Sequence, residues 1–301
     1  MSGDLCWQRD GANWPNHEAS GFVRVGNLTW HVQRMGTGSP LLLIHGTGAS
    51  THSWRAMLPL LAKKFDVVAI DLPGHGFTTG ETSRDLSLDG MASALARLLA
   101  VLEIEPRYGV GHSAGAAVLV RMCQTQRLAP RSLVALNGAM LPFPGMAGKL
   151  FPALAQVLYL NPVVPRLLSW RAQKEQNVRR LLEGMGSSID EEGVQLYTRL
   201  FRSTRHTRST IRMMAYWDLN GLAAGLGDLR PHLLLVAGSN DRAIPAEKSF
   251  EVKDMLKSAR VIVVRGGGHL LHEERPEYIS EIIIGELCSG AGTSAPDRVM
   301  K

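Results

Sequence analysis

The segment from Tyr108 to Gly115 reads Y-G-V-G-H-S-A-G and constrains the fold more than any other part of the chain. It begins as a short apolar strand, and the stretch from Ala114 to Leu128 that follows has the composition of a helix. Ser113 is therefore expected on a strained strand-to-helix turn, a nucleophile elbow, where the residues two before and two after it must be small. Gly111 and Gly115 meet this requirement. Such a turn exposes the serine hydroxyl beside a helix N-terminus, where unpaired N–H groups stabilise negative charge.

A serine is a weak nucleophile unless a neighbouring base takes its proton and a carboxylate orients that base. On elbows of this kind the acid and then the histidine follow the serine along the chain, each on a loop after a strand. The run from His232 to Ala237 predicts a buried strand, and Asp241 follows it. The next such run, from Ala259 to Val264, leads through three glycines to His269. We therefore predict Ser113, Asp241 and His269 as the catalytic residues.

Other residues compete for the roles of base and acid, because the chain contains ten histidines. His272 is the main rival of His269, since it lies three residues further on and could be one helical turn away. The glycine run favours His269, whereas His272 begins a helix-forming stretch. Asp218 and Asp228 do not follow predicted strands, and the position after the preceding strand, where some relatives place their acid, is Asn137. The remaining candidate histidines are His45 after a strand, His75 in the turn DLPGHG and His206 in an arginine-rich segment.

Acyl transfer passes through a tetrahedral oxyanion, and one preorganised hydrogen-bond donor to it is worth roughly 100- to 1000-fold in rate. We expect one donor to be the backbone N–H of Ala114, which follows the nucleophile. The other should come from the loop after the strand Pro40 to Ile44, where the sequence H-G-T-G places Thr47. Alone, this loop could be an ordinary glycine turn. Its position ahead of the GHSAG segment favours Thr47 as the second donor.

Composition limits the class of protein. A chain of 301 residues with 45% hydrophobic content can bury one large core. No stretch of 18 or more residues is free of charge and proline, and the N-terminus lacks the basic start and apolar region of a secretory signal, so we expect a cytoplasmic protein. Three cysteines without C-x-x-C spacing predict neither a disulfide framework nor a zinc site. No cofactor is expected.

Short apolar runs alternate with helix-like segments over most of the chain, and this pattern predicts an α/β fold. We expect a mostly parallel eight-stranded sheet covered by helices on both faces. The predicted strands are 22–25 and 28–35 as an antiparallel pair, then 41–44, 67–70, 108–110, 133–136, 233–236 and 261–264. The predicted helices are 54–64, 88–103, 114–128, 246–257 and 276–287. The core would comprise residues 20–138 and 231–288, with an N-terminal extension at 1–19 and a disordered tail at 289–301.

The alternation stops between residues 139 and 230, and this insertion predicts a helical cap over the active site. Its first part, Ala139 to Trp170, is apolar and rich in proline. Such a lining would suit a hydrophobic substrate, or contact with a membrane, although it could equally pack against the core.

The second part of the cap is basic. From residue 139 to 230 there are twelve Lys and Arg against seven Asp and Glu, so most of the formal net charge of +6 lies in the cap. Five arginines recur at intervals of three or four residues in this part. On a single helix they would spread over about half the circumference, either as a solvated face or as a patch that attracts carboxylates or an anionic membrane. No motif indicates binding to nucleic acid. These arginines are Arg199, Arg202, Arg205, Arg208 and Arg212.

Five motifs in order, HGTG, DLPGHG, GHSAG, GSNDRAIP and GGGHLLHEERPEYI, resemble the α/β-hydrolase fold family from Phe22 to about Leu287. More narrowly, the segment from Asp10 to Gly36 and the region LLLIHGTGASTHSWRAMLPLLAKKFDVVAIDLPGHGFT look like the BchO-type magnesium-chelatase accessory proteins of photosynthetic bacteria. That resemblance implies a role in bacteriochlorophyll synthesis, near magnesium insertion into protoporphyrin. It also implies a porphyrin as ligand and magnesium chelatase as partner.

Two hypotheses from different classes follow. In the first, the protein is a serine hydrolase that cleaves an ester or related acyl bond, since every residue required for this chemistry is present. In the second, it is a non-catalytic accessory protein that binds a tetrapyrrole or the chelatase and keeps the hydrolase fold, because fold alone does not fix function. A transferase or a C–C bond hydrolase using the same three residues is a further alternative.

Overall fold

The computed structural model describes residues 4–142, 161, 163–288 and 298–300. Within these residues a single sheet contains nine strands in the order β1-β2-β4-β3-β5-β6-β7-β8-β9. The pairs β1–β2 and β2–β4 are antiparallel and the remaining neighbours are parallel, so the predicted mostly parallel α/β sheet is confirmed. The strands are β1 (Ser20–Val25), β2 (Leu28–Met35), β3 (Ser39–Ile44), β4 (Phe65–Ile70), β5 (Tyr108–His112), β6 (Ser132–Leu136), β7 (His232–Gly238), β8 (Arg260–Val264) and β9 (Arg298–Met300).

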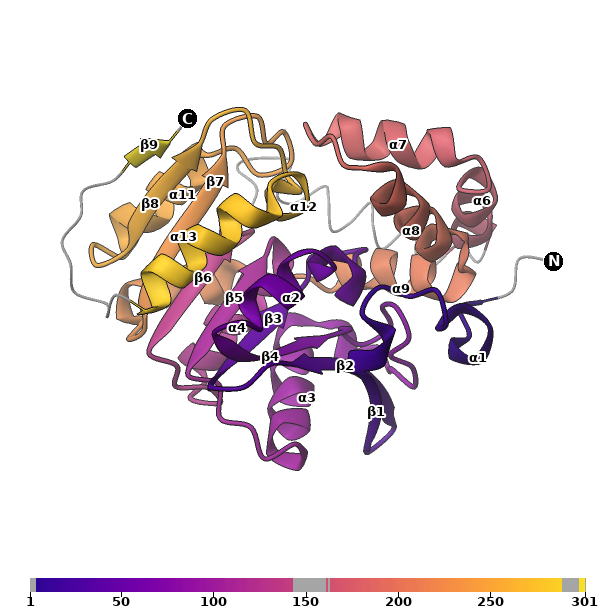
Figure 1. Ribbon diagram of the computed structural model, residues 1–301, viewed down its shortest axis with the longest axis horizontal. Helices are drawn as coiled ribbons and strands as arrows, with labels where there is room; N and C mark the ends of the chain where they lie inside the picture. The colour runs from indigo at the N-terminus through magenta and orange to yellow at the C-terminus, as the bar shows by residue number, and fades with distance from the viewer. Residues whose placement is uncertain (1–3, 143–160, 162, 289–297, 301) are drawn as a thin grey trace.

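Both faces of the sheet are buried because helices cover each of them, and side chains along a strand alternate between the two faces. In β3, Leu42 and Ile44 join the core on the face covered by α3 (Leu88–Val101), α4 (Ala114–Gln124) and α11 (Glu247–Met255). Leu41 and Leu43 join the core on the opposite face, under α2 (Met57–Leu61) and α13 (Pro276–Cys288). Figure 1 shows α13 across one face and α3 on the other side. A strand buried on both faces explains the continuous apolar run in the sequence.

Proline shortens the predicted helix 54–64 and divides the helix-forming stretch that begins at His272, whereas the predicted helix 276–287 is found as α13. The predicted helix 54–64 is a 3-10 turn at Thr51–Trp54 followed by α2, because Pro59 lacks an N–H and is tolerated only in the first turn of a helix. The stretch that begins at His272 forms two helices, α12 (Leu271–Glu274) and α13. The break falls at Arg275, since the residue before Pro276 is disfavoured in helical conformation.

The insertion contains helices and no strand among its described residues. They are α6 (Val163–Arg171), α7 (Glu175–Gly184), α8 (Glu191–Arg202), α9 (Thr204–Ala215) and α10 (Asn220–Ala224). In Figure 1, α6, α7, α8 and α9 lie together over one end of the sheet. Most of the apolar segment from Ala139 to Trp170, namely 143–160 and 162, lies outside the described residues.

The prediction that the five arginines share one helix is wrong. Ser203 ends α8 and its hydroxyl accepts the backbone N–H of His206, so it caps α9 and divides the arginines between two helices. Arg205 donates to the carbonyls of Gly76, at 2.5 Å, and Thr78, at 2.9 Å. Arg202 donates to the carbonyls of Ala172 and Gln173, and Arg199 donates to the carbonyl of Asp10. At least three of the five therefore bind the protein's own backbone instead of forming a free patch.

Described residues near both ends of the chain are also built into the fold. Residues 1–19 contain α1 (Trp7–Asp10), and Trp14 is buried against Phe77, Leu196 and Leu200, which ties this extension to the cap. The prediction of a disordered tail at 289–301 is wrong for β9, which pairs in parallel with β8. The exposed backbone groups of an edge strand accept a further strand whatever its side chains, so the composition of the tail does not reveal the pairing. Residues 289–297 and 301 lie outside the described part.

Candidate active site

Ser113 lies at the turn between β5 and α4 with φ 50° and ψ −117°, a strained conformation for a residue with a side chain. The glycines around it are required by close backbone contacts. A Cβ on Gly111 would lie 2.4 Å from the amide nitrogen of Ala116, and a Cβ on Gly115 would lie 2.2 Å from the carbonyl oxygen of Ile44. The backbone therefore has the form of the predicted elbow.

Asp241 and His269, on the loops after β7 and β8, are brought together by the parallel pairing of these strands. The Nδ1 atom of His269 lies 2.8 Å from Oδ2 of Asp241, and both side chains are almost fully buried. The other carboxylate oxygen, Oδ1, accepts the backbone N–H groups of Ala243 and Ile244, each at 2.8 Å. With the Nδ1 proton committed to the carboxylate, Nε2 of His269 is left as the basic atom.

Asn137 supports this pair. It follows β6 with φ 49°, and its side-chain Nδ2 donates to Oδ2 of Asp241 and, at 3.3 Å, to the carbonyl of Gly268. Burial alone would raise the pKa of Asp241, but the hydrogen bond and charge of His269, with further donors including Asn137, hold that pKa below its usual value. Sequence reasoning considered Asn137 only as a missing acid. An asparagine directly after a strand, a residue that tolerates positive φ, is the signal that could have drawn attention to it.

His112, the residue before the serine, was not singled out from the sequence. Its Nε2–H donates to the carbonyl of His269 at 2.8 Å, and the two rings lie 4.8 Å apart. Burial and the neighbouring His269 lower the pKa of His112 to about 3, so its ring is neutral. Gly46 is packed against it, since a Cβ there would lie 2.8 Å from Nδ1 of His112 and 3.0 Å from Cβ of Ser113. His112 thus fixes the backbone that carries His269.

His272, the rival base, lies elsewhere. Its ring is fully buried, 4.7 Å from the ring of Trp54 and 4.4 Å from that of His112. Neither of its ring nitrogens has a hydrogen-bond partner among the described residues, and burial holds its pKa well below the usual value. A cavity between the core and the cap is lined by Ser113 and His269, and His272 does not line it.

Two more of the candidate histidines brace the loop after β3. The Nδ1–H of His45 donates to the carbonyl of Gly46 at 2.7 Å, and its Nε2 accepts the N–H of Leu72 at 2.9 Å. From the cap, the Nε2–H of His206 donates to the carbonyl of Gly48 at 3.1 Å. Its Nδ1 accepts the N–H of Gly76, also at 3.1 Å. Burial keeps the pKa of His206 well below its usual value, as these donor and acceptor roles require. The third, His75, is buried and donates to the carbonyl of Pro73.

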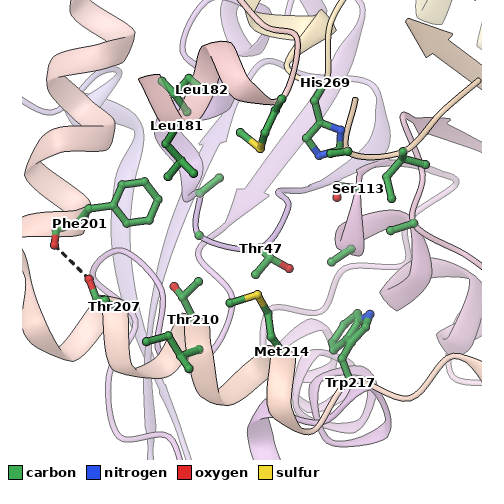
Figure 2. Close-up of a pocket in the computed structure, with 18 of the residues that line it drawn as sticks. Thr47, Ser113, Leu181, Leu182, Phe201, Thr207, Thr210, Met214, Trp217 and His269 are labelled. Atoms are coloured by element: carbon green, nitrogen blue, oxygen red, sulfur yellow. Dashed lines mark hydrogen bonds between the residues drawn. The ribbon is translucent and has the colours of Figure 1, made fainter. Parts of the chain in front are cut away.

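The predicted oxyanion donors lie in the same place as the serine. Thr47 and Ala114 line one cavity together with Ser113 and His269. Ala114 is the first residue of α4, where a backbone N–H has no acceptor within the helix. Figure 2 shows Thr47 on the cavity floor and His269 at the wall that also carries Ser113.

The cavity has a volume of about 1090 Å³ and lies between the core and the cap. Figure 2 shows Leu181 and Leu182 from α7 and Phe201 from α8 pointing into it, with Met214 from α9 and Trp217 opposite. The competing carboxylate Asp218 also lines it, whereas Asp228 lies in a 3-10 turn away from it. Most of the lining is apolar, and polar side chains line the cavity both beside Ser113 and on the cap. Such a site binds an apolar molecule and presents one region of it to the serine.

A sequence profile described as "Alpha/beta hydrolase family" matches residues 41–282, and with the fold and elbow above this shows that the chain belongs to the α/β-hydrolase family. Within that family it is similar to the magnesium-chelatase 30 kDa subunit of Rhodobacter capsulatus, with 36% identity over 91% of this chain and 96% of the relative. It is 26% identical to (E)-2-((N-methylformamido)methylene)succinate hydrolase of Acinetobacter baylyi over 85% of this chain and 92% of that protein. The crystal structure of an α/β-hydrolase fold protein from Burkholderia ambifaria superimposes with a TM-score of 0.76 at 21% identity, over 88% of this chain and 97% of that one.

Two other kinds of site are absent from the described ranges, namely a metal-binding cluster and a membrane-spanning helix. No cluster of three or more histidine, cysteine or acidic side chains is placed to hold a metal ion there. Helices long and apolar enough to cross a membrane are likewise absent from those ranges.

Proposed function

We propose that the protein is a serine hydrolase that cleaves an ester or related acyl bond of a hydrophobic substrate. The observation that carries this proposal is the 2.8 Å contact between His269 and Asp241 in a cavity that Ser113 also lines. An accessory protein that merely keeps the fold has no need of a buried, hydrogen-bonded carboxylate–histidine pair beside a strained serine.

In the first half of the proposed reaction, Oγ of Ser113 attacks the acyl carbon while Nε2 of His269 takes the hydroxyl proton. Asp241 holds the ring orientation and stabilises the positive charge that develops on it. The carbonyl oxygen becomes an oxyanion, which the backbone N–H groups of Thr47 and Ala114 stabilise. The C–O bond to the leaving group then breaks, and the leaving alcohol takes the proton from His269.

In the second half, a water molecule replaces the alcohol. His269 takes a proton from the water as its oxygen attacks the acyl carbon, and the same two N–H groups bind the new oxyanion. The bond to Oγ of Ser113 breaks, the proton returns from His269 to Oγ, and a carboxylic acid leaves. The net change is hydrolysis of one acyl bond by one water.

The size and lining of the cavity support a large apolar substrate, and the similarity to the magnesium-chelatase subunit supports a place in bacteriochlorophyll synthesis. We extend the proposal to a porphyrin as ligand and to magnesium chelatase as partner. The competing function is a non-catalytic accessory role, which the name of that relative, a chelatase subunit, favours. Quenching of protoporphyrin fluorescence by the Ser113→Ala variant would support a porphyrin ligand under either function.

We further propose a cytoplasmic location with peripheral membrane contact through the cap. Val163, Leu167 and Trp170 recur along α6 and are 60%, 49% and 69% exposed. Co-sedimentation with anionic vesicles, compared with a Leu167→Ser/Trp170→Ser variant, tests this contact. Equal pelleting of the two proteins would contradict it.

Hydrolysis of p-nitrophenyl esters tests the catalytic proposal. Ser113→Ala and His269→Ala should each lower kcat by several orders of magnitude, as loss of either partner does when the residues act as a unit. His272→Ala should retain most activity, because that ring lies outside the cavity. Activity retained in the serine variant would refute the proposal, and damage confined to the His272 variant would show that the base is wrongly assigned.

A further inference from the structure

Two cationic side chains lie at the edge of the mostly apolar cavity. Arg171 is the last residue of α6 and Arg180 lies in α7; both line the cavity and both are exposed. Their neighbours in the lining include Leu168 and Leu181, which are also partly open to solvent. The carboxylate in the described lining, Asp218, belongs to the segment after α9, and its Oδ1 accepts hydrogen bonds from Asn220. The side of the cavity formed by α6 and α7 is therefore positive.

Within the described residues, the two guanidinium groups differ from those of Arg179, Arg202 and Arg205 in having no partner. In the described part of the chain, neither Arg171 nor Arg180 donates a side-chain hydrogen bond or forms an ion pair. By contrast, Arg179, next to Arg180 on α7, pairs with Glu191 at 2.6 Å and with Glu175 at 3.4 Å. Arg202 and Arg205 bind backbone carbonyls. Arg179, Arg202 and Arg205, which do not line the cavity, are engaged within the protein, whereas the two arginines at its edge are available to a ligand.

We propose that this cavity binds an amphiphilic carboxylate, with the apolar body inside and the carboxylate at the edge against Arg171 and Arg180. Guanidinium groups match a carboxylate with paired hydrogen bonds, and an apolar wall beside them holds the adjoining chain or ring. The binding part of the proposal is independent of catalysis. Its consequence for the substrate rests on the proposed hydrolase function: the bond cut at Ser113 would belong to a molecule with an acidic group at its far end.

Equilibrium binding tests the proposal with a charged and a neutral form of one probe, 11-(dansylamino)undecanoic acid and its methyl ester. Dansyl fluorescence is titrated in a Ser113→Ala background so that neither probe can be consumed. Because exposed ion pairs are individually weak, we expect the acid to bind about fivefold more tightly than the ester at low ionic strength. This preference should fall to about onefold in Arg171→Gln/Arg180→Gln and should shrink with added salt in the parent protein.

The matched control is Arg166→Gln/Arg208→Gln, which removes the same charge from the cap. Both arginines are exposed, and neither lines the cavity. The control should keep the full preference for the acid. Equal affinities of the parent for acid and ester, loss of the preference in the control variant as well, or failure of both probes to bind would each overturn the proposal. Because binding alone is measured, an absence of esterase activity in wild type would count against the proposed function and leave this inference standing.

Discussion

Replacing His206 by asparagine or glutamine should separate the stability of the cap from the rate of catalysis. His206 makes two buried hydrogen bonds of 3.1 Å, one to Gly48 beside the predicted oxyanion donor Thr47 and one to Gly76 in the turn after β4. An asparagine side chain reaches about as far as Nδ1, so it keeps an acceptor for the N–H of Gly76. A glutamine side chain reaches about as far as Nε2, so it keeps a donor for the carbonyl of Gly48.

Each variant loses one hydrogen bond and leaves one buried backbone group without a partner, which costs about 1–3 kcal/mol of unfolding free energy. We therefore expect similar falls in Tm for the two. Only the asparagine variant releases the Gly48 carbonyl, and with it the loop that carries the Thr47 N–H. Because a displacement of about 1 Å near the reacting atoms can cost about 100-fold in rate, we expect kcat to fall roughly 10- to 100-fold in His206→Asn and less than about threefold in His206→Gln.

The assay is steady-state hydrolysis of a neutral p-nitrophenyl ester, with kcat and KM determined separately and Tm measured by differential scanning fluorimetry. A loss confined to kcat is expected, since the oxyanion forms only after the substrate binds. The reasoning is refuted if the two variants lose kcat equally, or if the glutamine variant is the slower. Either result would mean that His206 acts through the packing of the cap and not through the loop.

Two further predictions concern other buried groups. Asn137→Ala should lower kcat/KM about tenfold and unfolding free energy by about 1.5–3 kcal/mol, because it removes a donor to the Asp241 carboxylate; unchanged kinetics would show that Asn137 is not needed to hold the acid. Burial raises the pKa of Glu273 to about 7, and Arg55 opposes this effect in part. Because the folded protein then binds the proton more tightly than the unfolded chain, the stability gained from protonated Glu273 is complete below the usual pKa of 4.5 and is lost as pH rises through 7. The Tm should fall by several degrees between pH 5.5 and 8.5, for a loss of about 2 kcal/mol, and Glu273→Gln should flatten this slope. An equal slope in the variant would contradict the assignment.

The sheet could be predicted from the sequence because its signals are local. Runs such as that of β3 are apolar, short and bounded by turn residues, and their order along the chain specifies a parallel sheet. The elbow could also be predicted, because it requires small residues two positions before and two positions after the serine. Gly111 and Gly115 occupy these positions. The loops that carry Asp241 and His269 could be predicted from the same strands. The two side chains lie close together because β7 pairs with β8.

Features that depend on contacts between distant residues could not be predicted in this way. The hydrogen bonds of Asn137 to Asp241 and of His112 to His269 join residues 104 and 157 positions apart, and neither leaves a local pattern. The division of the arginine segment at Ser203 does have a local signal, since serine is a common N-cap, but the three-residue spacing of the arginines favours one continuous helix. β9 depends on the open edge of β8 and has no signal of its own in the tail.

The most direct test of the central claim is covalent labelling of Ser113 by a fluorophosphonate. Serine hydrolases are phosphonylated because the activated hydroxyl attacks phosphorus and the oxyanion donors hold the resulting oxygen. Intact-mass spectrometry of the wild-type protein should show one adduct, and peptide mapping should place it on the fragment that contains Gly111 to Gly115. Ser113→Ala should show none while keeping the wild-type Tm, and His269→Ala should label much more slowly. An unlabelled wild-type protein, or an adduct that persists in Ser113→Ala, would contradict the account.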